Sequence, residues 1–159
     1  MQYDFNANEI LQMAEQIERN GADFYRKSIE KIQDQAGKEL LLSLAEMEDQ
    51  HEKTFATLRS KLTADEKKQT VFDPNGETMG YLKALADSKV FFEKTIETDS
   101  MEGILKEAIT AEKDSILFYL GLKDVVPEAL GKDRIDAVIK EEMSHINLLT
   151  RELVALKKG

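Results

Sequence analysis

Residues 45–51 read AEMEDQH, which places Glu48 three residues before His51. The same pair occurs once more, as Glu142 and His145, and the protein has no other histidine. Three residues is slightly less than one turn of α-helix, so the glutamate and the histidine of each pair project from the same helix face. Two such pairs in one chain predict a metal site.

The two pairs belong to an internal repeat. A shift of 94 residues pairs Glu18 with Glu112, Tyr25 with Tyr119, Glu48 with Glu142, and His51 with His145. Glutamate is common in this chain, so a single Glu-x-x-His would mean little. Both histidines, however, have a glutamate at minus three and another at minus thirty-three, and composition alone would produce this roughly once in several thousand sequences. The repeat is the strongest signal in the sequence.

Apolar residues recur at three- and four-residue spacing over four long segments, which predicts four amphipathic helices. The expected helices span residues 7–34, 37–62, 100–123 and 132–157. The connection 63–99 is too long for adjacent antiparallel helices, whose loops usually run to about 2–8 residues. It suits a crossover along the bundle that contains short helices of its own. We therefore expect one all-α domain over residues 1–159, a four-helix bundle of two antiparallel hairpins.

Acidic residues interrupt the apolar stripe at the middle of each predicted helix. Residues equidistant from the turn of a hairpin lie at the same depth, so Glu18 should meet His51 in the first hairpin. By the same argument Glu112 should meet His145 in the second. Glu48 and Glu142 lie one turn from their histidines, where they can meet each other. The expected site has two metal positions, each with its own glutamate and histidine, bridged by Glu48 and Glu142.

Charge balance supports this arrangement. Four unpaired carboxylates on inward stripes would destabilise the fold by several kcal/mol each, and no lysine or arginine lies at an inward position near them. Two divalent cations would neutralise the four charges. The mixture of carboxylate and imidazole ligands suits iron or manganese and would also accept zinc.

The pattern resembles the di-metal carboxylate site of ferritin-like four-helix bundles, and in particular the short members of the rubrerythrin family. The blocks Glu18/Phe24-Tyr25 and Glu112/Phe118-Tyr119 are similar to those of that family. The resemblance implies iron ligands at Glu18, Glu48, His51, Glu112, Glu142 and His145. It also implies that Tyr25 and Tyr119 are hydrogen-bond partners of those ligands.

Two departures from the family limit what the resemblance implies. Rubrerythrins usually append a rubredoxin-like iron site held by four cysteines, and this chain has no cysteine, so electrons must come from a separate donor protein. They also carry an extra carboxylate on the third helix, one turn from its glutamate ligand. Here the flanking positions are Ile109 and Ser115, which argues against a mechanism in which one iron exchanges a histidine for that carboxylate.

Composition narrows the possible partners and cellular location of the protein. A net charge of -9 argues against nucleic acid and anionic membranes as partners, and no segment has the apolar length of a membrane span. Without cysteine there are no disulfides, which fits the cytoplasm. The amino terminus lacks the basic start and apolar run of a signal peptide. A homodimer is compatible with all of this.

The preferred hypothesis is a di-iron oxidoreductase that reduces hydrogen peroxide or dioxygen. Two alternatives stay open: an iron oxidation and storage protein, and a non-enzymatic helical bundle that metal stabilises. Solvated or surface positions, not ligand positions, are expected for the remaining glutamates near the site: Glu15, Glu46, Glu52, Glu107 and Glu141.

Overall fold

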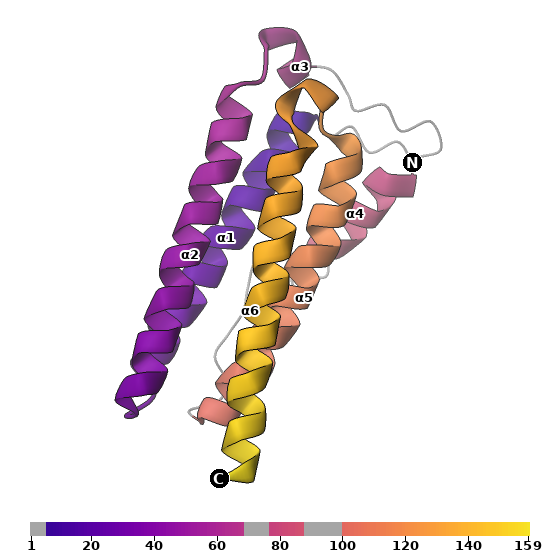
Figure 1. The fold of residues 1–159 in the computed structure, drawn as a ribbon. Coiled ribbons are helices and arrows are strands. Elements are labelled where there is room, and N and C mark those ends of the chain that lie inside the picture. The colour runs from indigo at the N-terminus through magenta and orange to yellow at the C-terminus, as the bar shows by residue number, and fades with distance from the viewer. Residues whose placement is uncertain (1–5, 69–76, 88–99) are drawn as a thin grey trace.

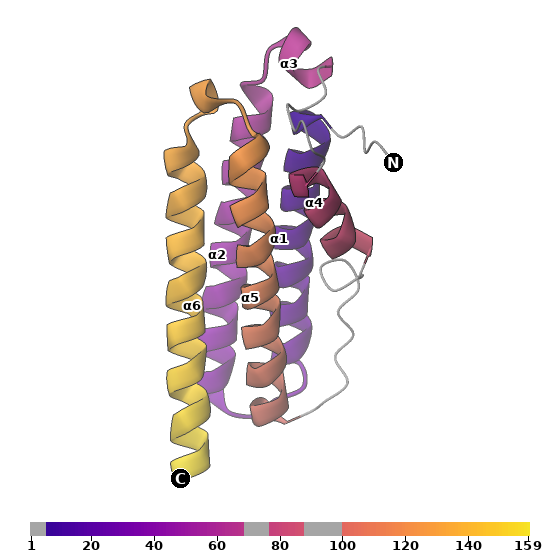
Figure 2. The same cartoon turned by 90° about the vertical axis from the view of Figure 1, so that its right-hand side faces the viewer.

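The computed structural model describes residues 6–68, 77–87 and 100–159. Four long helices form an antiparallel bundle (Figures 1 and 2), and its elements are α1 (Ala7–Ile29), α2 (Gln35–Ser60), α5 (Met101–Val125) and α6 (Lys132–Lys158). Helices α1 and α2 form one hairpin, and α5 and α6 form the other. The predicted all-α four-helix bundle is confirmed.

The described part of the connection between the hairpins contains two short helices, and short helices were expected there. Helix α3 (Ala64–Lys68) follows the end of α2, and α4 (Glu77–Asp87) packs against α5 (Figure 2). Tyr81 of α4 donates a hydrogen bond to the backbone oxygen of Leu117 on α5, at 2.7 Å. The parts of the crossover at residues 69–76 and 88–99 lie outside the described residues.

The predicted end of the first helix, at residue 34, is wrong. Helix α1 ends at Ile29, and the turn comprises residues 30–34. Asp34 has an extended backbone, and its carboxylate accepts a hydrogen bond from the backbone N–H of Gly37 at 2.9 Å, so this residue begins α2. The other helix ends lie within two residues of the predicted ones.

A short 3₁₀ helix, Glu128–Leu130, and Gly131 connect α5 to α6. Gly131 has a φ of 84°, in the region where a side chain would be strained. This glycine lets the chain reverse between Leu130 and the first turn of α6.

Two apolar clusters occupy the two ends of the bundle interior. The first includes Ile10, Leu11, Phe55, Leu58, Phe118, Leu122, Ile135 and Val138. The second includes Phe24, Leu41, Leu44, Ile104, Leu105 and Leu149. Each fully buried side chain of this size contributes about 1.5–3 kcal/mol to stability. In all four helices the sequence between the two clusters carries the predicted acidic and histidine positions, so the fold holds a polar layer between two apolar ones.

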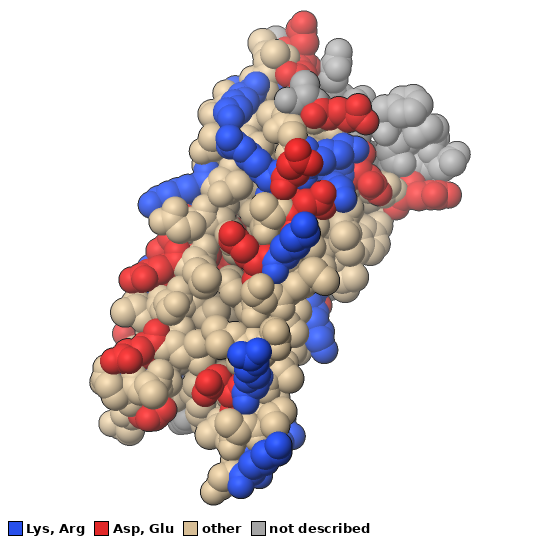
Figure 3. All heavy atoms as spheres, viewed as in Figure 1, with Lys and Arg blue, Asp and Glu red and all other residues tan. Residues whose placement is uncertain are grey.

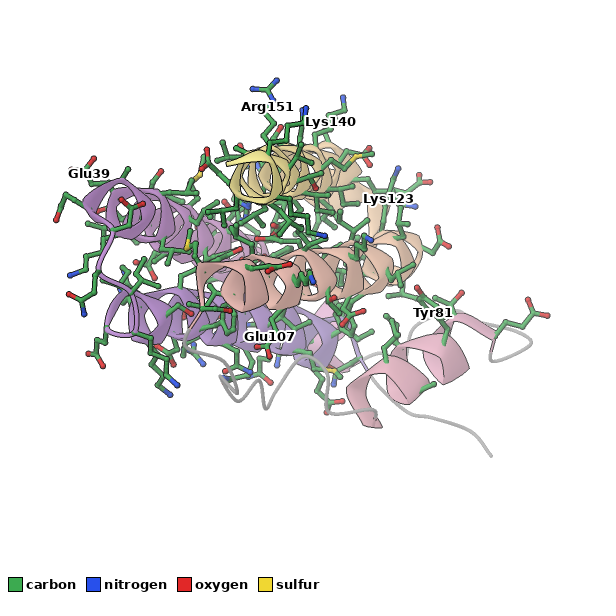
Figure 4. The ribbon with its side chains drawn as sticks, turned by 90° about the horizontal axis from the view of Figure 1, so that it is seen from below. Glu39, Tyr81, Glu107, Lys123, Lys140 and Arg151 are labelled. Carbon is green, nitrogen blue, oxygen red and sulfur yellow. The ribbon has the colours of Figure 1, made fainter. Side chains whose placement is uncertain are left out.

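Charged side chains are scattered over the outside of the bundle (Figure 3). Basic and acidic groups are interspersed on the face that Figure 3 shows, without one continuous patch of either sign. Figure 4 shows Lys140 and Arg151 projecting from α6 away from the other helices. Among the described residues, no helix is both long enough and apolar enough to cross a membrane.

Glu15 differs from the prediction of a surface position. Its side chain is only 8% exposed, and Arg59 of α2 covers it with two hydrogen bonds, from Nε to Oε2 at 2.5 Å and from Nη2 to Oε1 at 3.1 Å. The helical stripe places Glu15 at the edge of the interior, and the long arginine side chain closes over it. A buried carboxylate of this kind destabilises the fold when its charged partner is removed.

Replacing Arg59 with methionine should therefore destabilise the fold. The Glu15 carboxylate would stay buried without its partner, and we expect the free energy of unfolding to fall by about 2 kcal/mol. The double variant Glu15→Met/Arg59→Met should recover most of this loss, because neither charge then remains. Urea unfolding of the three proteins would measure the effect, and an equal loss in the single and double variants would contradict the role given to the pair.

Candidate metal centre

The structure brings all six predicted ligand residues into the polar layer at the centre of the bundle. Glu18 comes from α1, Glu112 from α5, and the two Glu-x-x-His pairs from α2 and α6. No more than 4% of any of the six residues is exposed. Unpaired carboxylates are almost never this deeply buried, so the layer requires a compensating charge.

The donor atoms fall into two groups. The His51 group contains Glu18, Glu48, His51 and Glu142, and the His145 group contains Glu48, Glu112, Glu142 and His145. Within each group, one atom from every residue lies within 4.8 Å of the others. Both groups contain Glu48 and Glu142, whereas Glu18 and Glu112 each belong to one group, and we call these two the unshared glutamates.

The Nδ1 atom of His51 faces the carboxylates of its group. It lies 3.1 Å from Oε1 of Glu142, and 3.5 Å from Oε2 of both Glu18 and Glu48. Each of these carboxylates comes from a different helix. Imidazole nitrogen and carboxylate oxygens therefore converge on one space, as ligands of a single metal ion would.

The second histidine has the equivalent arrangement. Nδ1 of His145 lies 3.1 Å from Oε2 of Glu142, 3.3 Å from Oε1 of Glu112 and 4.0 Å from Oε1 of Glu48. The rings of His51 and His145 are stacked, with their centroids 5.7 Å apart. Glu142 presents one oxygen to each histidine, so this residue lies between the two groups.

Two tyrosines hold the unshared glutamates from the opposite hairpin. The Tyr25 hydroxyl on α1 donates to Oε1 of Glu112 on α5, at 2.6 Å. The Tyr119 hydroxyl on α5 donates to Oε1 of Glu18 on α1, at 2.5 Å. Burial raises the pKa of both tyrosines, and the nearby carboxylate raises it further. Both hydroxyls therefore stay protonated and remain donors.

Replacing Tyr119 with phenylalanine should weaken the bundle, because the buried Glu18 loses its hydroxyl donor. We expect the free energy of unfolding to fall by about 1–3 kcal/mol, and Tyr25→Phe should have a similar effect through Glu112. Tyr81→Phe is the matched control, since it removes a hydroxyl that bonds to a backbone oxygen at an exposed site. Its loss should stay below about 1 kcal/mol. Chemical denaturation measures all three, and an equal loss at Tyr81 and Tyr119 would contradict the buried contact.

The pKa values of three glutamates in the layer are raised, as expected where buried carboxylates lack compensating cations. Burial raises the pKa of Glu48 and of Glu142 well above the usual range, and the charge of Glu112 raises both further. The pKa of Glu18 rises to about 7, first because of burial and then because of the charge of Glu142. Repulsion and desolvation thus oppose full ionisation of the layer.

For Glu112 and His51, hydrogen bonds shift the pKa in the direction opposite to the effect of burial. Burial would raise the pKa of Glu112, but hydrogen bonds with Glu142 and His145 lower it to about 2. Burial would likewise lower the pKa of His51, but the carboxylates that face its ring, Glu142 first, stabilise the protonated form and raise the pKa overall. In the metal-free chain, bound protons and the imidazolium charge thus compensate the carboxylates, as metal ions would do in the loaded protein.

The donor set fits two divalent ions. Within the described parts of the chain, no lysine or arginine forms an ion pair with any of the four central carboxylates. Among the described residues, the buried Oε2 of Glu18 has no hydrogen-bond partner and lies 3.5 Å from Nδ1 of His51, so it faces the layer and is available to a cation. Four carboxylates and two neutral imidazoles would balance two divalent cations.

One residue at this site was not expected from the sequence. Glu141 was predicted to be solvated, and its side chain is 57% exposed, yet its Oε2 lies 2.5 Å from Nε2 of His51. Periodicity assigns a residue to a helix face, but a long side chain at the edge of that face can reach the neighbouring helix. Of the other glutamates expected outside the site, Glu46 is exposed and Glu52 pairs with Arg19 at 2.7 Å.

Comparisons with known proteins agree with this geometry. The model of the rubrerythrin family matches residues 9–153. No curated protein matches the chain. A crystal structure from Thermotoga maritima, provisionally described as a ferritin-like diiron-carboxylate protein, superposes with a TM-score of 0.70 at 24% identity, covering 96% of this chain and 97% of that one. This likeness shows that the bundle has the ferritin-like fold.

Proposed function

The chain belongs to the rubrerythrin family, and from this premise we propose that it is a di-iron carboxylate oxidoreductase that reduces hydrogen peroxide or dioxygen. One observation carries the proposal: two Glu/His groups that share Glu48 and Glu142 are buried in one layer. Among the described residues, no lysine or arginine forms an ion pair with the four carboxylates of this layer. Such a layer is costly unless cations occupy it.

In this proposal six residues hold the metal ions. Glu48 and Glu142, which belong to both groups, would be shared by the two ions, and each ion would have one histidine and one unshared glutamate of its own. Bound iron would supply redox electrons and an open coordination position for the oxidant. Manganese and zinc suit the same ligands, but zinc has no redox chemistry, so an oxidoreductase role favours iron.

The protein's own groups prepare the site for this chemistry. Tyr25 and Tyr119 hold the unshared glutamates in place through hydroxyl groups that stay protonated. The two apolar clusters lie on either side of the layer and exclude water from it. In a site with few waters, electrostatic interactions between ligands and ions are stronger than at the surface.

We propose that electrons reach this centre from another protein, since the given sequence has no cysteine with which to hold a rubredoxin-like iron site. The positions one turn from Glu112 are Ile109 and Ser115, and neither carries the extra carboxylate of rubrerythrins; the Ser115 hydroxyl donates to the backbone oxygen of Ala111 at 3.0 Å. We therefore propose a mechanism without exchange of a histidine for that carboxylate. A cytoplasmic location and a homodimer remain predictions from the sequence.

The proposal is tested by loading the protein with two equivalents of ferrous iron without oxygen and adding peroxide or dioxygen in stopped flow. We expect an absorbance change at a rate that rises with oxidant concentration, at least tenfold faster than in the variant Glu18→Ala/Glu112→Ala. Identical rates in the two proteins would overturn the oxidoreductase assignment. Lack of reaction together with a higher melting temperature in iron would support the non-enzymatic alternative.

The storage alternative requires a hollow assembly of many subunits. Light scattering of the iron-loaded protein distinguishes it, because a monomer or a dimer has no cavity in which to store iron. We expect a particle no larger than a small oligomer. A cage of many subunits would favour storage.

A further inference from the structure

We propose that the two metal positions are inequivalent because Glu141 supports His51, whereas no acceptor among the described residues supports His145. The position in the His51 group should therefore bind metal more tightly and fill first. This inference rests on the proposed function, since it concerns the ions that the two groups would hold. The internal repeat allows the two positions to be compared, because the two halves of the sequence match at all six ligand positions, so any inequivalence must come from residues around the ligands.

The two nitrogens of His51 face different partners. Nδ1 lies among the carboxylates of its group, 3.1 Å from Glu142, while Nε2 lies 2.5 Å from Oε2 of Glu141. A neutral histidine carries one N–H, and the partner of that N–H decides which nitrogen is free to bind metal. With Nε2–H donating to Glu141, the lone pair of Nδ1 points into the His51 group. Glu141 is thus a positioning residue, which acts on the metal through His51.

The second histidine lacks this support. Its Nδ1 faces the carboxylates in the same way, but its Nε2 is buried and has no hydrogen-bond partner within residues 6–68, 77–87 and 100–159. The shift of 94 residues that relates Glu48 to Glu142 also relates Met47 to Glu141. A thioether is at best a weak acceptor, so the first half of the chain provides no carboxylate equivalent to Glu141. The repeat is therefore broken next to the ligands, at Met47.

The expected consequence is a difference in affinity. A hydrogen bond from the distal N–H to a carboxylate orients the imidazole and makes it a stronger ligand, and loss of such partners typically lowers metal affinity by about 10- to 100-fold. Of the four described carboxylates that contact His51, that of Glu141 is 57% exposed and the other three are buried. Glu141 can be replaced without placing a new group in the buried layer, which makes it suitable for mutagenesis.

The chain offers a direct test, because His51 and His145 are its only histidines. In protein with ¹⁵N-labelled histidine, each ring gives its own signals, and zinc serves as a redox-inert probe. With one equivalent of zinc we expect the His51 signals to shift first and those of His145 to follow with the second. Calorimetry should give two affinities that differ by about 10-fold or more. Simultaneous shifts with equal affinities, or His145 shifting first, would overturn the inference.

Three variants assign the cause. Glu141→Ala should weaken the tighter zinc site by about 10- to 100-fold and remove the preference for His51, whereas Glu141→Gln, which keeps an acceptor oxygen, should retain part of that preference. Met47→Glu should strengthen the His145 site, because it supplies the carboxylate that the repeat lacks there. Glu152→Ala is the matched control, since it removes an exposed carboxylate three turns further along α6.

The outcomes separate this inference from the proposed function. If the wild-type protein binds two zinc ions but Glu141→Ala and Glu152→Ala behave alike, the inference fails while the metal centre stands. The inference also fails if Glu141→Ala lowers only the melting temperature and leaves the order of filling unchanged. If the wild-type protein binds no zinc at the histidines, both the inference and the proposed centre are wrong.

Discussion

Replacing Glu48 with alanine should leave a protein that binds one metal ion per chain instead of two. Glu48 belongs to both groups of ligands, so its removal takes one ligand from each position. The charge balance changes as well: with one divalent ion the three remaining carboxylates keep a charge of -1, which a proton can neutralise, whereas two divalent ions would leave a buried charge of +1 that no group in the layer can compensate. The second ion should therefore be lost.

Elemental analysis after dialysis against excess metal measures this stoichiometry. Glu142→Ala should give the same result, because the repeat relates Glu142 to Glu48 and both groups share it. Glu46→Ala is the control, an exposed glutamate of the same helix that should keep both ions. Circular dichroism should show that the Glu48 variant remains helical, since the change relieves repulsion in the layer. Two ions bound at wild-type affinity would rule out a bridging role for Glu48.

The metal-free protein should lose stability as the pH rises from about 5 to about 7. The folded protein retains the proton of Glu18 up to a pKa of about 7, whereas the unfolded chain releases it near 4.5. The folded state thus binds more protons in this window, and its stability falls as pH increases. For Glu18 alone the loss is on the order of 3 kcal/mol.

The other buried groups do not reverse this sign. The pKa values of Glu48 and Glu142 are also raised, which continues the loss in the same direction. The raised pKa of His51 stabilises the fold below 6.5, and that contribution is lost only as pH rises further. Glu112, with a pKa lowered to about 2, stabilises the fold above 4.5 and loses this contribution only in acid.

Bound metal should abolish this dependence. Cations take the place of the protons, so the free energy of unfolding in excess manganese should stay level or rise between pH 5 and pH 7. Urea unfolding with a chelator, and again with manganese, measures both profiles. In Glu48→Gln the metal-free loss should be smaller, while Glu46→Gln should match the wild type. A metal-free protein that becomes more stable over this window would contradict the electrostatic account of the layer.

The repeat and the helical periodicity were sufficient to predict much of this molecule. Glu18, Glu112 and the two Glu-x-x-His pairs were identified because polar residues interrupted apolar stripes at related places. Burial of these residues in one layer follows from the same pattern, because the flanking residues must pack inward. The role of the six residues as metal ligands remains a prediction from that pattern.

What the sequence could not provide were interactions that depend on side-chain reach between helices. Tyr25 and Tyr119 were expected to bond to ligands, but the pairing across the two hairpins depends on how α1 lies against α5. Glu141 and Glu15 were assigned to the outside from their positions on the helices. Both make contacts through long side chains at the edge of a face, where periodicity does not distinguish exposed from covered.

The end of α1 was misplaced for a different reason. Residues 30–34 have no glycine or proline to stop the helix, and the pattern of apolar residues continues to Ile32, which is buried. The helix ends because Asp34 caps the next one. In a periodic pattern a capping aspartate looks like any other polar residue. The pattern therefore did not show that Asp34 would begin α2 and so prevent α1 from continuing to it.

The central claim is that the buried Glu/His layer holds two cations, and anomalous diffraction tests it most directly. Crystals grown with manganous salt should show two anomalous peaks per chain, one within the His51 group and one within the His145 group. Data from the Glu48→Ala variant should then show one peak. A map with no anomalous peak among the six side chains, or with the four central glutamates turned outward into water, would contradict the account.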